Sequence, residues 1–302
     1  MTPSKPHLVR TISEFHQLHE LPSPEHPLIS IVDYAQMQVS EDPVAVTFGY
    51  YSIALKRGVS KLFYGQQEYD FDEGVLYFMA PNQTLRRQAS PIETERSGWL
   101  LLIHPDFFWN TSLAKSIRQY EFFDYAIHEA LFLSEKEETI FNGLIENIRQ
   151  EYHSNIDAFS KSIIISSIET LLNYANRFYH RQFITREKAN HQLLERLETL
   201  LNAYFENPEQ VANGLPTVQY VADQLHVSSG YLGSLLRNLT GQNTQQHIHD
   251  KLIAKAKEKL STTSLSVSEI AYGLGFEYTQ SFSKLFKAKT QVSPVAFRQS
   301  FH

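Results

Sequence analysis

Histidine and cysteine are the side chains most often used to bind catalytic metals, and their distribution here does not favour a metal site. The chain has 13 His and no Cys. The segment 28–103, where short strands are expected, contains no His. His247 and His249 lie on a predicted helix, where residues i and i+2 point apart. No Gly-rich phosphate loop, Ser/His/Asp set or carboxylate pair stands at a strand end. We therefore expect no metal, no cofactor, no catalytic residue and no enzyme.

Basic side chains are concentrated in the C-terminal part, where they could bind a polyanion. The net charge of the whole chain is −6. Residues 1–185 carry 15 Lys and Arg against 23 Asp and Glu, whereas residues 228–302 carry 9 against 4. This asymmetry indicates two modules, of which only the C-terminal one suits a nucleic acid.

Length and composition agree with a folded protein of about two domains. The chain has 302 residues, of which 42% are hydrophobic and 20% are charged. Apolar runs such as Trp99 to Ile103 are too short to span a bilayer, and the start MTPSKPHLVR lacks a signal-peptide core. The absence of Cys excludes a disulfide scaffold. We expect a cytoplasmic protein that does not bind membranes.

The secondary structure predicted for the first 180 residues changes along the chain from an extended arm to short strands and then to long helices. Residues 1–27 hold 5 of the 12 prolines, which predicts an extended arm that packs onto another part. Short alternating runs between turn residues in 28–103 predict a β-sandwich or barrel. Apolar residues at helical spacing in 140–152 and 159–178 predict two long helices joined near Ser154. Their apolar stripes could cover only their own sheet domain or also a second subunit.

The C-terminal part contains a degenerate repeat of two helix-turn-helix units. Copy one, VQYVADQLHVSSGYLGSLLRNLTG, begins at Val218, and copy two, VSEIAYGLGFEYTQSFSKLFKAKTQ, begins at Val267. Their first helices match at an offset of 49 residues and their second helices at an offset of 50. Small Ala222 and Ala271 allow each helix pair to cross closely, and Gly275 suits a turn with positive φ.

Capping and spacing signals agree with this organisation. Thr217 and Ser266 are placed to cap the first helices, and Ser228 to cap the second helix of copy one. A helix predicted from Thr244 to Leu260 would be about 25 Å long. With the bodies of the two copies added, it could hold their second helices about one DNA turn, roughly 34 Å, apart.

Copy two and the residues after it contain a recognisable pattern, SVSEIAYGLGFEYTQSFSKLFKAKTQVSPVAFRQS. Its matching positions are Ile270-Ala271, Gly275-Phe276, Phe282-Ser283-Lys284-Leu285-Phe286-Lys287, Ser293-Pro294 and Arg298. Through them, residues 190–302 resemble the AraC/XylS family of bacterial transcription regulators. Gln291 departs from the family, which usually has Gly there, and should strain or lengthen that helix end. The front half is similar to cupin-like sensor domains in its strand texture and in GWLLLIHPDFF.

The resemblance implies an α+β chain of two domains. Residues 1–185 would form a cupin-like β-barrel with trailing helices, acting as a sensor and dimerisation domain. Residues 190–302 would form an all-α DNA-binding domain. Its helix-turn-helix units would span about 217–240 and 266–290, joined by a linker helix, and its partner would be double-stranded DNA.

The family reads bases with exposed residues in the first two turns of each second, or recognition, helix. In copy two these residues are Thr279, Gln280, Ser283 and Lys284. Gln can pair bidentately with adenine, and Lys with guanine. Lys287 and also Lys289 are better suited to phosphates. We expect copy two to carry most of the direct base readout.

The matching positions of copy one are Gly230, Gly233 and Ser234, which have little or no side chain. Ser229, Arg237 and Asn238 remain for contacts that would mostly be with the DNA backbone. We therefore expect copy one to dock on phosphates or to respond to DNA shape.

Two functions remain open. The first is a sequence-specific transcription regulator, controlled by a small organic ligand or by dimerisation of the front half. It would be a homodimer, with RNA polymerase as a further partner. Aromatic residues between Phe48 and Trp99 could line the ligand pocket or simply fill the core. The alternative is a catalytic cupin enzyme that carries a DNA-binding tail.

Overall fold

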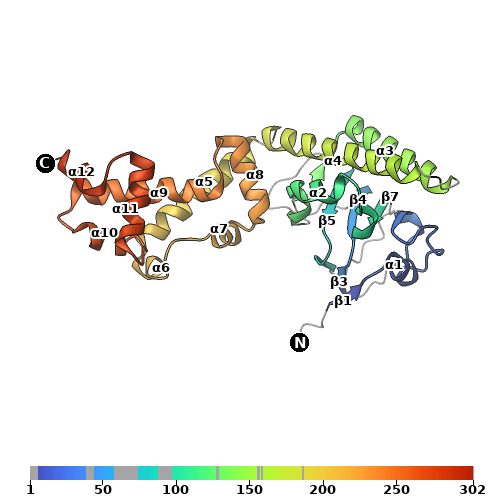
Figure 1. Cartoon of the computed structure of the whole chain (residues 1–302), viewed down its shortest axis with the longest axis horizontal. Coiled ribbons are helices and arrows are strands. Elements are labelled where there is room, and N and C mark those ends of the chain that lie inside the picture. Colours follow the sequence, from blue (N-terminus) through green and yellow to red (C-terminus); the bar gives the residue numbers. More distant parts are fainter. Residues whose placement is uncertain are drawn as a thin grey trace. The chain divides into compact units, whose positions relative to one another are not determined.

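The computed structural model describes residues 6–38, 44–57, 74–87, 97–126, 129–154, 157, 159–185 and 187–301. Contacts divide the chain into two compact units, Met1–Gln182 and Phe183–His302, here called the N-terminal and C-terminal units. The first combines strands and helices and the second is helical (Figure 1). The expected strand at 61–65, with the aromatic residues of 58–73, lies outside the described residues. No described helix is long and apolar enough to cross a membrane.

The strands of the N-terminal unit form two sheets. The smaller has the order β1 (His7–Val9), β3 (Val44–Phe48), β6 (Thr84–Arg87), with β1 parallel to β3. The larger is antiparallel, in the order β2 (Ile29–Asp33), β7 (Ser97–Ile103), β4 (Tyr51–Arg57), β5 (Val75–Met79), β8 (Leu131–Phe132). The described strands therefore do not form the expected closed barrel. An alternating pattern specifies strands and their buried faces, but not whether the edges of two sheets pair.

The proline-containing arm is more ordered than the expected extended segment. It contains helix α1 (Ile12–Leu18), which begins with a capping box between Thr11 and Glu14. Ile12 and Phe15 belong to one buried apolar cluster with residues of both sheets, including Phe48 of β3 and Leu102 of β7. As predicted, the arm packs onto another part of the chain, and that part is the sheet core.

Two long helices follow the larger sheet, as predicted. They are α3 (Glu135–His153) and α4 (Ser160–Thr185). Ile168 and Leu172 of their apolar stripes are fully buried within one chain. Tyr179 of α4 contacts Phe78 of β5, with ring centroids 6.2 Å apart. The stripe thus covers the unit's own sheet, which is the simpler of the two expectations.

Short helices connect these elements. Within the described residues they are α2 (Leu113–Ser116) and the 3₁₀ helices Tyr34–Gln36, Pro105–Phe108, Ile117–Gln119 and Glu121–Asp124. Phe122, in the last of these, stacks on Tyr179 with ring centroids 5.5 Å apart. The connection thereby fills the space between β5 and α4.

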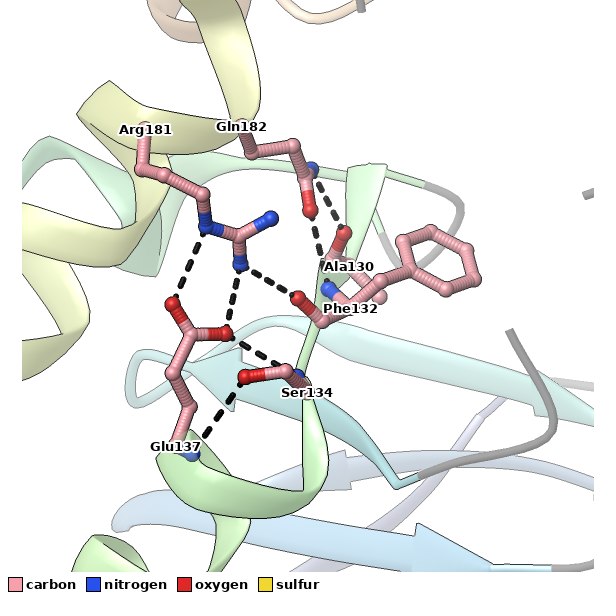
Figure 2. Close-up of polar contacts among 6 residues, drawn as sticks. All are labelled: Ala130, Phe132, Ser134, Glu137, Arg181 and Gln182. Atoms are coloured by element: carbon pink, nitrogen blue, oxygen red, sulfur yellow. Dashed lines mark hydrogen bonds and ion pairs between the residues drawn. The ribbon is translucent and has the colours of Figure 1, made fainter. Parts of the chain in front are cut away.

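The C-terminal end of α4 is tied to β8 and to α3 by a polar network (Figure 2). Arg181 donates from Nε and Nη2 to the carboxylate of Glu137, at 3.0 and 2.8 Å, and from Nη2 to the carbonyl of Phe132 at 2.8 Å. The amide of Gln182 accepts from the N–H of Phe132 at 2.9 Å and donates to the carbonyl of Ala130 at 3.1 Å. Gln182 thus satisfies backbone groups of an edge strand much as a further strand would.

The C-terminal unit contains helices α5 to α12. They are α5 (Glu187–Glu206), α6 (Pro208–Ala212), α7 (Val218–Leu225), α8 (Ser229–Thr240), α9 (Thr244–Thr262), α10 (Val267–Tyr272), α11 (Thr279–Thr290) and α12 (Pro294–Gln299). Helix α6 stands where a loop was expected at 207–216, and α12 was not predicted as a separate helix. Both begin with a cap followed by Pro, Asn207-Pro208 and Ser293-Pro294, which is a recognisable helix start.

Candidate nucleic-acid interface

Each copy of the repeat folds as two helices joined by a tight turn. Ala222 of α7 and Ala271 of α10 are fully buried where the helices approach their partners. In copy two the turn contains Gly275 at φ 88°, and a Cβ there would lie 2.8 Å from the carbonyl oxygen of Gly214. Copy one has His226 at the matching position, at φ 60°. The positive φ predicted for Gly275 is confirmed, and copy one adopts the same turn without glycine.

The predicted caps of these helices are also confirmed. The hydroxyl of Thr217 accepts from the N–H of Tyr220, and that of Ser228 accepts from the N–H of Tyr231, both at 3.1 Å. Ser266 and Glu269 form a reciprocal capping box. In contrast, Tyr278 at the N-cap of α11 makes no side-chain capping bond and is 60% exposed. The second recognition helix therefore begins with an uncapped turn beside an exposed aromatic ring.

Helix α9 connects the two copies. Its 19 residues correspond to about 28 Å. Its buried residues Leu252, Ile253, Ala256 and Leu260 share one core with Ile270, Leu274, Phe282 and Phe286 of copy two. Copy two is therefore packed rigidly along the C-terminal half of α9, and the predicted spacer helix ends two residues later than expected.

The sequence-predicted residues of copy two lie on the side of α11 opposite this core. Gln280, Lys284 and Lys287 are exposed, and Thr279 and Ser283 are half-buried. Among the described carboxylates, none pairs with Lys284 or Lys287 within 4.0 Å. Helix α11 thus presents an amide, hydroxyls and two cations along one stripe, which can donate hydrogen bonds to base edges and phosphates.

Copy one presents a different surface. Gly230 and Gly233 are half-buried, and the hydroxyl of half-buried Ser229 donates to the side-chain oxygen of Gln219 at 2.9 Å. Ser234 is only 8% exposed, and Nη2 of exposed Arg237 lies 3.3 Å from its hydroxyl. Ser234 is thus mostly buried within the chain, which does not favour the predicted DNA contact, and its hydroxyl lies close to Arg237. Asn238 is half-buried and donates to the carbonyl of Ser234 at 2.8 Å.

Some contacts of this surface were not expected from the sequence. Lys289, interpreted as a phosphate ligand, pairs with Asp250 of α9 at 2.7 Å. The positions of Lys289 and Asp250, 39 residues apart, carry no local signal that would predict the pair. Exposed Tyr278 could have been noticed as the residue immediately before the predicted base-reading stripe.

Comparison with known proteins agrees with this geometry. Residues 221–300 match a family described as a helix-turn-helix domain. The chain is 30% identical over 142 residues to the uncharacterized HTH-type transcriptional regulator YfiF of Bacillus subtilis, covering 47% of this chain and 42% of YfiF. It is 35% identical over 82 residues to the HTH-type transcriptional activator AarP of Providencia stuartii, covering 26% of this chain and 61% of AarP.

A solved structure resembles the same region. It is the C-terminal domain of the two-component response regulator yesN from Fusobacterium nucleatum, at 32% identity and a TM-score of 0.29, covering 33% of this chain and 96% of that chain. The chain spans less than half the length of YfiF and about a third of the regulator YijO of Escherichia coli. The family match thus falls on residues 221–300, which contain most of the two helix-turn-helix copies, and the C-terminal unit of this chain contains a helix-turn-helix domain similar to those of transcription regulators.

Proposed function

We propose that the whole chain is a sequence-specific DNA-binding transcription regulator. The observation that carries this proposal is the stripe of Gln280, Lys284 and Lys287 on α11, held outward by a fully buried opposite face. A recognition helix needs this combination, because the buried face fixes its orientation while the outer face contacts the groove.

The two copies would divide the work of binding. Thr279, Gln280, Ser283 and Lys284 of copy two would contact base edges, with Lys287 on a phosphate. In copy one, Ser229, Gly230, Gly233 and Arg237 would approach the DNA backbone. The glycines let α8 come close to the duplex, and Arg237 supplies the positive charge.

The N-terminal unit would regulate this binding, through a small organic ligand or through formation of a homodimer. The exposed side chains that support a dimer contact are Ile163 of α4, which is 46% exposed, and Phe159, which directly precedes α4 and is 69% exposed. Ile163 lines a shallow groove between α3 and α4, together with Leu144 and Thr170. RNA polymerase is the further partner that a transcription regulator on DNA would contact.

Selection from a pool of randomised duplexes tests the proposal. The full chain should enrich one motif, and Lys284→Ala should lose the preference at one or two positions of that motif. The matched control is Lys257→Ala, which removes an exposed cation of α9 whose ammonium lies 5.9 Å from the ring of Phe297. A pool that stays random with the wild-type chain would contradict the proposed function.

A further inference from the structure

A single carboxylate in the C-terminal unit connects the ends of both recognition helices. Asp250, in the second turn of α9, accepts a hydrogen bond from the amide nitrogen of Gln242 at 2.8 Å. Gln242 directly follows Gly241, the C-cap of α8. The other carboxylate oxygen accepts from the ammonium of Lys289, in the last turn of α11, at 2.7 Å. Asp250 is therefore a residue of helix α9 whose side chain bonds to the end of each copy.

The charge of Asp250 is stabilised in this position. Partial burial raises the pKa of its carboxyl group, but the hydrogen bonds from Lys289 and Gln242 outweigh this effect and leave the pKa below its ordinary value. The carboxylate is thus ionised at neutral pH and keeps both bonds. Lys289 is in turn paired with Asp250, whereas no described carboxylate pairs with Lys284 or Lys287 on the same helix. Lys289 therefore ties α11 to α9, and its positive charge is already neutralised and is not available to a DNA phosphate.

The place of this contact matters for how the two copies move. The apolar core fixes copy two along the C-terminal half of α9. Asp250 lies toward the other end, where the chain leaves α8 and where α11 ends. A small rotation about α9 at this point would be magnified at the N-terminal ends of α8 and α11, about a helix length away, and those ends carry most of the predicted DNA contacts.

We propose that Asp250 is a positioning residue that sets the distance and angle between the two recognition helices, and thereby the spacing of the two DNA half-sites that the protein accepts. The inference rests on the proposed function, because it assumes that both copies contact one duplex. Adding one base pair moves a half-site by about 3.4 Å and rotates it around the duplex, so a stiff pair of copies should discriminate between spacings.

Binding to duplexes with shifted half-sites tests this role with the full chain. For the selected motif, one base pair is inserted or removed between the half-sites, and the spacing penalty is the ratio of the dissociation constants. We expect Asp250→Ala to reduce that penalty about two- to fivefold, the range that a partly exposed ion pair can supply. Lys289→Ala should have the same effect, and the double variant should add nothing further. Asp250→Asn, which can still accept from Gln242, should be intermediate.

Glu258→Ala is the matched control. Glu258 is also on α9 and also pairs with a lysine, Lys255, at 3.4 Å, but both residues belong to that helix. Its removal takes away one negative charge and one ion pair without disconnecting the copies. A uniform change in affinity at all spacings, equal in Asp250→Ala and Glu258→Ala, would show that Asp250 acts only through its charge and would overturn the proposal.

A second readout does not depend on DNA. Because the chain has no Cys, Ser229→Cys and Gln280→Cys place one spin label at the start of each recognition helix. We expect the distribution of label distances to broaden in Asp250→Ala and to stay narrow in Glu258→Ala, with far-UV circular dichroism confirming that both variants fold. An equally narrow distribution in Asp250→Ala would overturn the proposal. If the wild-type chain shows no sequence preference, the proposed function fails, and this distance measurement alone decides the positioning role.

Discussion

Gln291 ends the second recognition helix in a conformation that favours glycine, so replacing it should stabilise the protein. It is the C-cap of α11 at φ 66°, whereas copy one has Gly241 at φ 75° at the matching position. A non-glycine residue in the left-handed region costs about 1–2 kcal/mol. Removing this cost with glycine is partly offset, by about 0.5–1 kcal/mol, because glycine loses more conformational freedom on folding. Gln291→Gly should therefore stabilise the C-terminal unit by about 0.5–1 kcal/mol.

The reverse change in copy one is the matched control. A Cβ added at Gly241 would meet no atom within 4 Å, so Gly241→Gln should cost only the backbone strain. We expect the thermal midpoint to rise by about 2–5 °C in Gln291→Gly and to fall by a similar amount in Gly241→Gln. Far-UV circular dichroism follows the helices, while Trp99 and Trp109, both in the N-terminal unit, report by fluorescence a transition that should not change.

One result would refute this reasoning. The side chain of Gln291 donates to the carbonyl of Ala288 at 3.3 Å, a contact that glycine loses. If Gln291→Gly lowers the midpoint or leaves it unchanged while Gly241→Gln lowers it, that side-chain contact outweighs the backbone strain. The left-handed cap would then not be a cost to this protein.

Two further predictions concern assembly and pH. If the N-terminal unit dimerises through Phe159 and the exposed start of α4, the double variant Phe159→Glu/Ile163→Glu should sediment as a monomer and keep the Trp fluorescence of the wild type. Ile168→Glu should instead disrupt the unit's own core, and a wild-type chain that already sediments as a monomer at micromolar concentration would contradict the dimer. Burial lowers the pKa of His247 and His249 below 6.5, and Asp250 opposes this only in part, so the unfolded state binds more protons than the folded state and the C-terminal unit should lose stability as pH falls below about 6.5. Denaturant unfolding should show that the stability of the double variant His247→Gln/His249→Gln depends less on pH than that of the wild type, and an equal pH dependence in the two would contradict this assignment.

Local signals in the sequence predicted the C-terminal unit well. The caps at Thr217, Ser228 and Ser266 and the turn at Gly275 depend on residues only a few positions apart, which a sequence pattern contains directly. The departure at Gln291 was visible because the resembled family usually has Gly there, and the structure shows Gly241 at the matching position of copy one. The structure shows that α11 is not lengthened there but ends in a left-handed residue.

Features that depend on distant residues were not predictable in this way. The stripe of α4 is equally apolar whether it covers a sheet or a second subunit, and only packing shows that Ile168 and Leu172 are buried within one chain. Ser234 was predicted on the DNA-contacting face, but it is buried in the folded unit, and helix periodicity does not specify how the folded unit packs around it. Sheet closure likewise depends on hydrogen bonds between edges that are far apart in the chain.

The division of work between the two copies is the central claim, and binding isotherms for two variants test it most directly. The affinities of Lys284→Ala and Arg237→Ala are measured on the selected motif and on a scrambled duplex at several salt concentrations. Lys284→Ala should lose about 1–3 kcal/mol of discrimination at one or two base pairs. Arg237→Ala should weaken binding to both duplexes about equally and lower the slope of log affinity against log salt by about one. Equal, sequence-neutral losses for both variants, or a changed preference only in Arg237→Ala, would contradict base reading by copy two.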